Sequence, residues 1–120
     1  MSDRPSASSG DEKLPGTYRE IAEKFGQITD AHDQMSRAAE QAGPLDKQTQ
    51  ALVKIGMCVG AGLESALRSH VRRAVEQGVT REQIEHAIML GMTTCGFPQS
   101  AAAYAWAQVQ FKREERDRDG

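Results

Sequence analysis

Aromatic residues and cysteines are scarce in this chain of 120 residues. One Trp, two Tyr and three Phe leave the hydrophobic core to be built mainly from Leu, Ile, Val, Met and Ala. Small side chains each bury little apolar surface, so we expect self-association to be a further source of stability. The two cysteines, Cys58 and Cys95, are too few and too far apart in sequence for a disulfide framework.

Long apolar runs, a large net charge and strand patterns are also absent. No run approaches the length of a membrane span, and the first residues, MSDRPSASSGDEKLPG, lack the apolar segment of a signal peptide. We therefore expect a cytoplasmic protein without a membrane partner. With 15 Lys and Arg against 17 Asp and Glu, the formal charge is −2, which predicts no nucleic-acid partner. No alternating β-branched run occurs, so strands are not expected.

Helical periodicity is what the chain does have. It begins after residues 1–16, whose Ser, Gly, Pro and charged side chains predict a disordered arm. The pair Thr17 and Glu20 is typical of a capping box, and a first helix is predicted from there to the Gly43-Pro44 dipeptide. The apolar face of this helix is Tyr18, Ile21, Phe25, Ile28, His32, Met35 and Ala39.

A second helix is predicted after Asp46, whose carboxylate can cap it. Val53 and Met57 lie outside its main apolar stripe, and apolar residues on more than one face predict a helix buried between others. The run 60–62, Gly-Ala-Gly, either ends this helix or marks a close backbone contact. The main stripe is Leu52, Ile55, Gly56, Val59 and Leu63.

Three more helices follow. A third is predicted up to Val75, with Gly78 closing it, and a capping box at Thr80 and Gln83 predicts the start of a fourth. The apolar face of the fourth helix reaches Cys95. Residues after it continue in a fifth helix, whose first turn suits Pro98 and which gives way to the charged end KREERDRDG. The predicted fold class is all-α, a bundle of about five to six helices. We expect a single domain over residues 17–116 and a charged tail over 117–120.

The stretch 45–105 resembles the core of the carboxymuconolactone decarboxylase family, whose fold is that of alkylhydroperoxidase D. Three motifs carry the resemblance: RSHVRRA at 68–74, GVTREQI at 78–84 and CGFP at 95–98. Each motif alone is weak, but together with their spacing they are fairly specific. The resemblance implies a homo-oligomer, either a trimer or a hexamer.

The family has two functional branches, decarboxylases that act on γ-carboxymuconolactone and peroxidases that resemble alkylhydroperoxidase D. The peroxidases use a Cys-x-x-Cys followed by a His four residues after the second Cys. When that motif is aligned on His70, the two cysteines fall on Leu63 and Ala66, and a Glu of the preceding helix falls on Ala51. Thiol peroxidase chemistry needs a thiolate, a resolving thiol and a proton relay. The resemblance therefore implies the branch without Cys-x-x-Cys.

His70 is the candidate catalytic residue. It lies on an apolar stripe, so it is either a hydrogen-bonded core or interface residue or a group that faces a pocket, and its family position supports a function. Decarboxylation of a lactone needs a donor for the developing oxyanion, a cation for a second carboxylate and an acid for carbon. His70 can be the donor or the acid, and Arg68 and Arg72 are candidate substrate-binding cations. We expect Arg73 and Glu64 on a solvated face.

Other polar and sulfur-containing residues carry weaker hypotheses. Cys58 and Cys95 are interpreted as small buried hydrophobes rather than redox groups. His32 is a candidate neighbour of His70 in its own or an adjoining chain, and His86 lies on a face that we expect at a subunit interface. Three His without a carboxylate cluster at ligand spacing predict no metal site.

The sequence thus predicts a decarboxylase, if the protein is catalytically active, that acts on a lactone or a related small carboxylic acid without a cofactor. One alternative is a peroxidase-type antioxidant protein with the same fold. Another is a non-enzymatic oligomeric binding protein that kept the fold and lost the site. Resemblance in fold does not by itself fix a function, so the substrate stays open.

Overall fold

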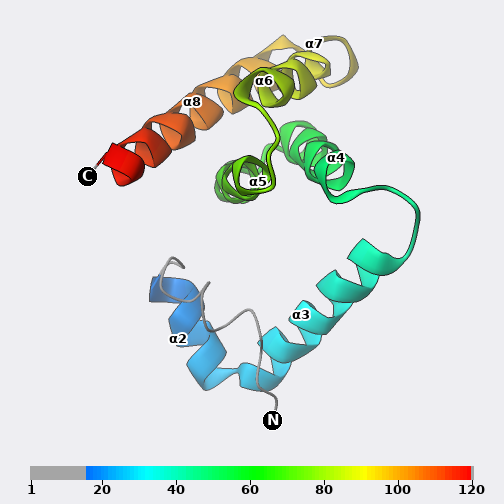
Figure 1. Ribbon diagram of the computed structural model, residues 1–120, viewed down its shortest axis with the longest axis vertical. Helices are drawn as coiled ribbons and strands as arrows, with labels where there is room; N and C mark the ends of the chain where they lie inside the picture. Colours follow the sequence, from blue (N-terminus) through cyan, green and yellow to red (C-terminus); the bar gives the residue numbers. More distant parts are fainter. Residues whose placement is uncertain (1–15, 120) are drawn as a thin grey trace. The chain divides into compact units, whose positions relative to one another are not determined.

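The computed structural model describes residues 16–119, and every regular element in that range is an α-helix, which confirms the all-α prediction. None of these helices combines the length and the apolar composition that a membrane span requires. The helices, labelled as in Figure 1, are α2 (Gly16–Lys24), α3 (Gly26–Gln41), α4 (Lys47–Ala61), α5 (Glu64–Glu76), α6 (Arg81–Met89), α7 (Gly91–Thr94) and α8 (Phe97–Asp119).

The chain divides into two compact units, Met1–Pro44 and Leu45–Gly120. The single domain predicted over residues 17–116 spans both units. The predicted arm over residues 1–16 lies outside the described residues, except for Gly16, which begins α2. Thr17 therefore lies inside α2 rather than at the N-cap where the predicted capping box places it.

The first predicted helix is divided at Phe25. This residue has φ −129° and ψ 51°, outside the helical region, and α3 begins at Gly26. Glycine in a helix interior costs about 1 kcal/mol relative to Ala, so a continuous helix is weakest at this point. The prediction of one helix is wrong here. The Thr29 hydroxyl donates to the Gly26 carbonyl at 3.1 Å, in the first turn of α3. Most of the predicted apolar face is exposed, including Ile21, Phe25, Ile28 and Met35.

Helix α4 begins and ends as its sequence predicts. Asp46 is the N-cap, and its Oδ1 accepts a hydrogen bond from the Thr49 backbone N–H at 2.8 Å. This hydrogen bond lowers the pKa of the Asp46 carboxyl. Gly62 follows the helix with φ +68°, a left-handed conformation that glycine adopts without a Cβ clash. Because only Gly62 and Leu63 separate α4 from α5, the two helices pack as neighbours in a hairpin.

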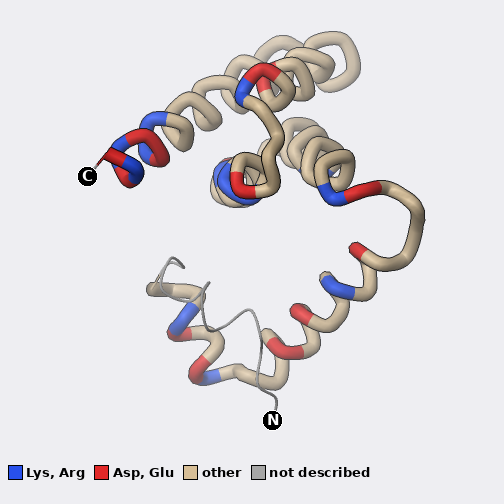
Figure 2. The backbone as a smooth tube through the Cα atoms, in the orientation of Figure 1, with Lys and Arg blue, Asp and Glu red and all other residues tan. Residues whose placement is uncertain are grey.

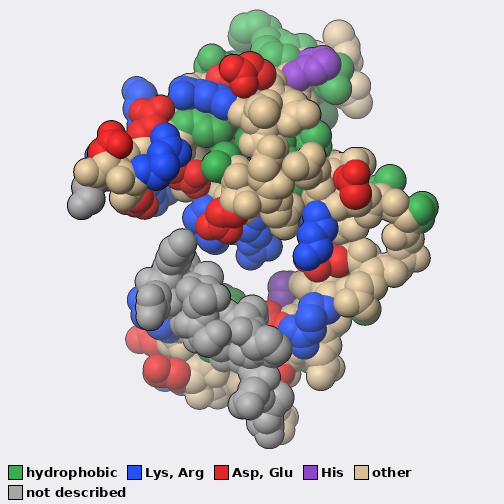
Figure 3. All heavy atoms as spheres, viewed as in Figure 1, with side chains coloured by type: hydrophobic (Ala, Val, Ile, Leu, Met, Phe, Trp, Pro, Cys, Tyr) green, Lys and Arg blue, Asp and Glu red, His purple; other side chains and the backbone are tan. Residues whose placement is uncertain are grey.

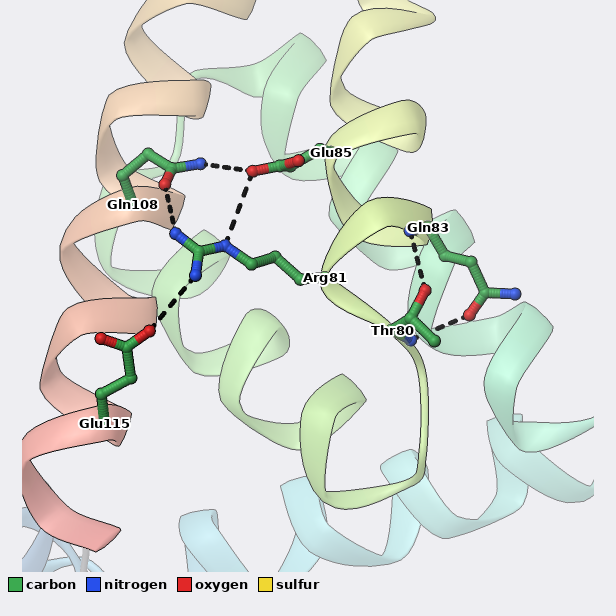
Figure 4. A network of polar contacts seen from close by, with 6 residues as sticks. All are labelled: Thr80, Arg81, Gln83, Glu85, Gln108 and Glu115. Carbon is green, nitrogen blue, oxygen red and sulfur yellow. Dashed lines mark hydrogen bonds and ion pairs between the residues drawn. The ribbon is translucent and has the colours of Figure 1, made fainter. Parts of the chain in front are cut away.

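The turn from α5 to α6 also follows its sequence signals. Gly78, with φ +90°, lies one residue beyond the C-cap of α5. Thr80 then caps α6: its hydroxyl accepts from the Gln83 backbone N–H at 3.1 Å, and the Gln83 side chain accepts from the Thr80 N–H at 2.9 Å (Figure 4). Both bonds of the predicted capping box are therefore present.

The fourth predicted helix is divided at Leu90 into α6 and the short α7. Gly91, the first residue of α7, is buried against α8: a Cβ built on it would lie 2.8 Å from Ser100 Oγ and 3.0 Å from Val59 Cγ1. Close packing of the Ser100 and Val59 side chains against the backbone of α7 thus explains the glycine. Helix α8 contains Pro98 in its first turn, as predicted, and extends to Asp119, through the charged end where the sequence analysis expected the helix to stop.

Helices α4, α5, α6 and α8 surround the core of the second unit. The core is aliphatic, as the scarcity of aromatic residues implies. Ile55, Leu67, Ile84 and Ile88 are its largest fully buried side chains. Other core members are Ala51, Cys58, Val59, Val71, Ala74, Val79, Ala103, Ala107 and Phe111.

Several apolar side chains of the second unit stay on its surface. Helix α4 packs against α5, α6 and α8, as predicted for a helix between others, but Val53 and Met57 on it are 42% and 65% exposed in the single chain. Leu90 and Phe97 are 62% and 65% exposed, where α6, α7 and the start of α8 meet. Figure 3 shows hydrophobic side chains, in green, gathered over this end of the unit.

Candidate functional site

His70 lies in the middle of α5 at the border between core and surface. Leu67, Val71 and Ala74 on the same helix are fully buried, whereas the imidazole is half-buried. Burial lowers the pKa of His70, and the positive charges of Arg73 and Lys54 lower it further. Each of these effects disfavours the imidazolium ion, so the ring is mainly neutral near pH 7.

The His70 imidazole has no hydrogen-bond partner among residues 16–119. A core histidine normally has such a partner. The alternative that His70 is a hydrogen-bonded core residue is therefore not what the single chain shows. A neutral imidazole has one N–H donor and one acceptor nitrogen. Both stay available to a ligand or to a neighbouring chain.

Arg68 and Arg72 do not join His70 in this arrangement. At 100° per residue they lie roughly 160° around α5 from His70, on either side of the opposite face. Each pairs with a glutamate one turn away: Arg68 Nη1 lies 3.5 Å from Glu64 Oε2, and Arg72 Nη1 lies 3.6 Å from Glu76 Oε2. The expected surface position of Glu64 is confirmed. Within one chain, Arg68 and Arg72 thus form ion pairs along α5. Their predicted role in substrate binding stays a prediction.

Two other cations act on His70 instead. Arg73 follows it by three residues on α5, and Lys54 belongs to the neighbouring helix α4. Figure 2 shows the Lys and Arg positions of α5 in blue. Arg73 is exposed, which confirms the solvated face predicted for it, whereas the sequence analysis gave Lys54 no role toward His70. One signal pointed to Lys54, since it is a charged residue within the otherwise apolar and neutral stretch 51–63.

The positions of the peroxidase residues hold apolar side chains. Ala51 is buried in the core, Ala66 is partly buried, and Leu63 is 48% exposed. Cys58 is buried and Cys95 partly so, and burial raises the pKa of the Cys58 thiol. A raised pKa keeps a thiol protonated and unreactive, which agrees with its interpretation as a small hydrophobe.

The other two histidines lie on other helices than His70 and are more exposed. His32 on α3 is exposed and belongs to the first unit; His86 on α6 is exposed as well. The two expected roles, as a neighbour of His70 and at a subunit interface, stay predictions. In the part of the chain that the structure describes, no group of three or more His, Cys, Asp or Glu side chains could hold a metal ion.

A polar network joins α6 to α8. Arg81 lies 3.7 Å from Glu85 and 3.3 Å from Glu115, and it donates to Gln108 at 2.8 Å (Figure 4). Gln108 in turn donates to Glu85 at 2.8 Å, and the Arg81 guanidinium stacks on Phe111 at 4.6 Å from the ring centroid. Since all of its charges are paired internally, we interpret this network as structural.

Comparison with known proteins places these helices in one family. The sequence pattern of the carboxymuconolactone decarboxylase family matches residues 24–109. The chain is 34% identical over 68 residues to a 4-carboxymuconolactone decarboxylase of Acinetobacter baylyi, covering 57% of this chain and 51% of that protein. It thus spans about half the length of this curated relative. A crystal structure of a family member from Legionella pneumophila matches with a TM-score of 0.71 and 20% identity, over 81% of this chain and 86% of the other. This last likeness concerns the fold alone.

Proposed function

Since this chain belongs to the carboxymuconolactone decarboxylase family, we propose that it decarboxylates a lactone or a related small carboxylic acid without a cofactor, with His70 at the reacting group. The proposal takes its reaction class from the name of the Acinetobacter relative, of which this chain spans about half. The observation that carries it is the place of His70 on α5, a half-buried imidazole that has no hydrogen-bond partner among residues 16–119.

The reaction needs no external oxidant or reductant. The bond between the carboxylate carbon and the ring breaks, and carbon dioxide leaves. The electron pair of that bond moves through the conjugated system onto the lactone carbonyl oxygen, which becomes an enolate. A proton then adds to carbon and restores the carbonyl. The developing oxyanion is the point at which an enzyme gains most, because a fixed donor binds it more strongly than the ground-state oxygen.

His70 suits the donor role better than the acid role. A lowered pKa leaves little imidazolium at neutral pH, whereas a neutral imidazole still carries an N–H that can donate to an enolate oxygen. The positive charges of Lys54 and Arg73 also favour negative charge at this place. We therefore assign to His70 the hydrogen bond to the oxyanion, and to solvent or a further group the delivery of the proton.

Kinetics of His70 variants test the assignment, with 4-carboxymuconolactone as the first substrate and release of carbon dioxide as the readout. For His70→Ala we expect kcat to fall on the order of 100-fold with a smaller change in KM, because the lost hydrogen bond forms mainly in the transition state. His70→Gln, which keeps the volume and a donor in another position, should melt near the wild type and still lose most activity. Full activity of His70→Ala would end the catalytic assignment.

The peroxidase alternative has less support, because Leu63, Ala66 and Ala51 stand where that chemistry needs two thiols and a carboxylate. We expect no thiol-dependent reduction of an organic hydroperoxide, measured with a dithiol reductant and with Cys58→Ser and Cys95→Ser as controls. Turnover that either substitution abolishes would contradict this expectation. The third reading, a binding protein without activity, predicts that the wild type releases no carbon dioxide from any lactone acid offered.

A further inference from the structure

Two cations act on His70, one from its own helix α5 and one from the neighbouring helix α4. Arg73 is three residues beyond His70 on α5, and side chains at this spacing are neighbours on a helix surface. Lys54 precedes Gly62 by 62 − 54 = 8 residues, and His70 follows it by 70 − 62 = 8 residues. In two helices that pack side by side across a two-residue link, equal separations from the turn give similar heights along the pair. The effect of both charges on His70 agrees with this placement.

Within residues 16–119, Lys54 of α4 and Arg73 of α5 lack the carboxylate partner that the other arginines of α5 and α6 have. Arg68, Arg72 and Arg81 each lie within 4 Å of a glutamate. Among residues 16–119 neither Lys54 nor Arg73 forms such an ion pair. Lys54 is also only partly exposed to solvent. Two like charges near a half-buried imidazole disfavour one another, and an anion bound between them would remove that cost.

Apolar surface adjoins the same place. Ala66, one turn before His70 on α5, is partly exposed. Met57, three residues after Lys54 on α4, is 65% exposed. A ligand that reaches both cations therefore also meets apolar side chains on either helix. This combination suits a small carboxylate with an apolar body better than a strongly hydrated inorganic ion.

We propose that Lys54 and Arg73, together with His70, form the carboxylate-binding site of this protein, in place of Arg68 and Arg72. The inference rests on the proposed function for the ligand class but not for the existence of the site. Lys54 and Arg73 would hold one carboxylate of the substrate and leave the His70 N–H directed to its reacting end. Arg68 and Arg72 keep their glutamate partners.

Binding of a non-reacting probe tests the site apart from turnover. We would follow the His70 ring signals by NMR while adding succinate, and the uncharged succinamide is the control. The signals that are missing from the spectrum of His70→Gln assign those of His70. Succinate should shift the signals in a saturable way and raise the pKa of His70, because an anion stabilises the imidazolium ion. Succinamide should do neither. A response to succinamide, or none to succinate, would overturn the proposal.

Matched variants locate the cations. Lys54→Gln and Arg73→Gln should each weaken succinate binding by about 2- to 5-fold, the range expected for exposed and partly exposed charges, whereas Arg68→Gln and Arg72→Gln should leave it unchanged. Thermal melting checks that each variant is folded, and Lys54→Met, which keeps the apolar stem, replaces Lys54→Gln if that variant melts early. Equal weakening in all four variants would mean a general charge effect and refute the site.

Two further outcomes separate this inference from the proposed function. Inorganic phosphate is the competing oxyanion, and tighter binding of phosphate than of succinate would overturn the carboxylate assignment. If succinate binds through Lys54 and Arg73 but no lactone acid loses carbon dioxide, the site stands and the enzymatic proposal fails. If decarboxylation occurs and Lys54→Gln and Arg73→Gln leave both KM and succinate binding unchanged, the enzymatic proposal stands and the site fails.

Discussion

Replacing Gly91 by alanine tests how closely α7 packs against α8. The new Cβ would lie 2.8 Å from Ser100 Oγ and 3.0 Å from Val59 Cγ1, both closer than a Cβ normally approaches its neighbours in proteins. Ser100 is fully buried, so its side chain cannot move into solvent. Either α7 must shift away from α8 or both neighbours must change their positions.

The magnitude follows from two opposed effects. An added methyl in a well-packed core costs about 1–3 kcal/mol, whereas Ala in place of Gly in a helix contributes up to about 1 kcal/mol in the other direction. We therefore expect Gly91→Ala to destabilise the protein by about 1–2 kcal/mol, or roughly 3–8 °C in Tm for a chain of this size. Ser100→Ala should lessen the effect, because it removes the nearer of the two contacts. The Ser100 hydroxyl has no hydrogen-bond partner among the described residues, so its removal alone should be neutral or stabilising.

Thermal and urea denaturation of four variants measures these effects. Gly56→Ala is the matched control, since a Cβ there would meet nothing within 4 Å, and it should stabilise α4 slightly. The double variant Gly91→Ala/Ser100→Ala should show a favourable coupling energy of about 0.5–1 kcal/mol relative to the two single changes. If Gly91→Ala is as stable as Gly56→Ala, the close packing of α7 on α8 is refuted.

Three more predictions concern the cap, the surface and the candidate histidine. Asp46→Ala should lower Tm, and Asp46→Asn should lower it less. The decrease in Tm for Asp46→Ala should become smaller as the pH falls through the lowered pKa of the Asp46 carboxyl, because the wild-type cap is then itself protonated. We expect light scattering to show a homo-oligomer at roughly tens of micromolar protein. Leu90→Glu should shift the protein toward smaller species, because it places a charge on an exposed apolar residue that we expect in the interface. A monomeric wild type would contradict this prediction. Stability should fall as the pH drops through the unfolded-state value of His70, 6.5, because the folded state resists protonation, and His70→Gln should remove that dependence in chemical denaturation; an unchanged dependence would assign it to other groups.

Local signals in the sequence predicted most helix ends. Asp46 and Thr80 each place a side-chain acceptor three residues before a free backbone N–H, and both bonds form. Gly62 and Gly78 lie where the chain needs positive φ, which few other residues adopt. These interactions involve neighbours along the chain, so a sequence contains nearly all the information that they need.

The divisions at Phe25 and Leu90 have a different origin. Both lie within an apolar stripe that continues past them, so periodicity alone predicts one continuous helix through each position. The break at Leu90 accompanies the contact of Gly91 with Ser100, a residue of the next helix. The break at Phe25 precedes Gly26, which has open space around it and so reflects weak helix propensity rather than packing. Glycine in a stripe therefore marks a possible break without revealing which cause applies.

The charged residues around His70 show how distance along the sequence differs from placement on the helices. Arg68 and Arg72 are closest to His70 in sequence, yet spacings of two residues put side chains on opposite sides of a helix. Arg73, at a spacing of three, shares the side of His70, and that relation was visible in the sequence. Lys54 is 16 residues away, since 70 − 54 = 16, and its charge acts on His70 because Gly62 turns the chain back on itself. The turn was predicted only as one of two possibilities for the run 60–62. Once the left-handed conformation of Gly62 fixes the hairpin, counting outward from the turn places Lys54 at a height on α4 similar to that of His70 on α5.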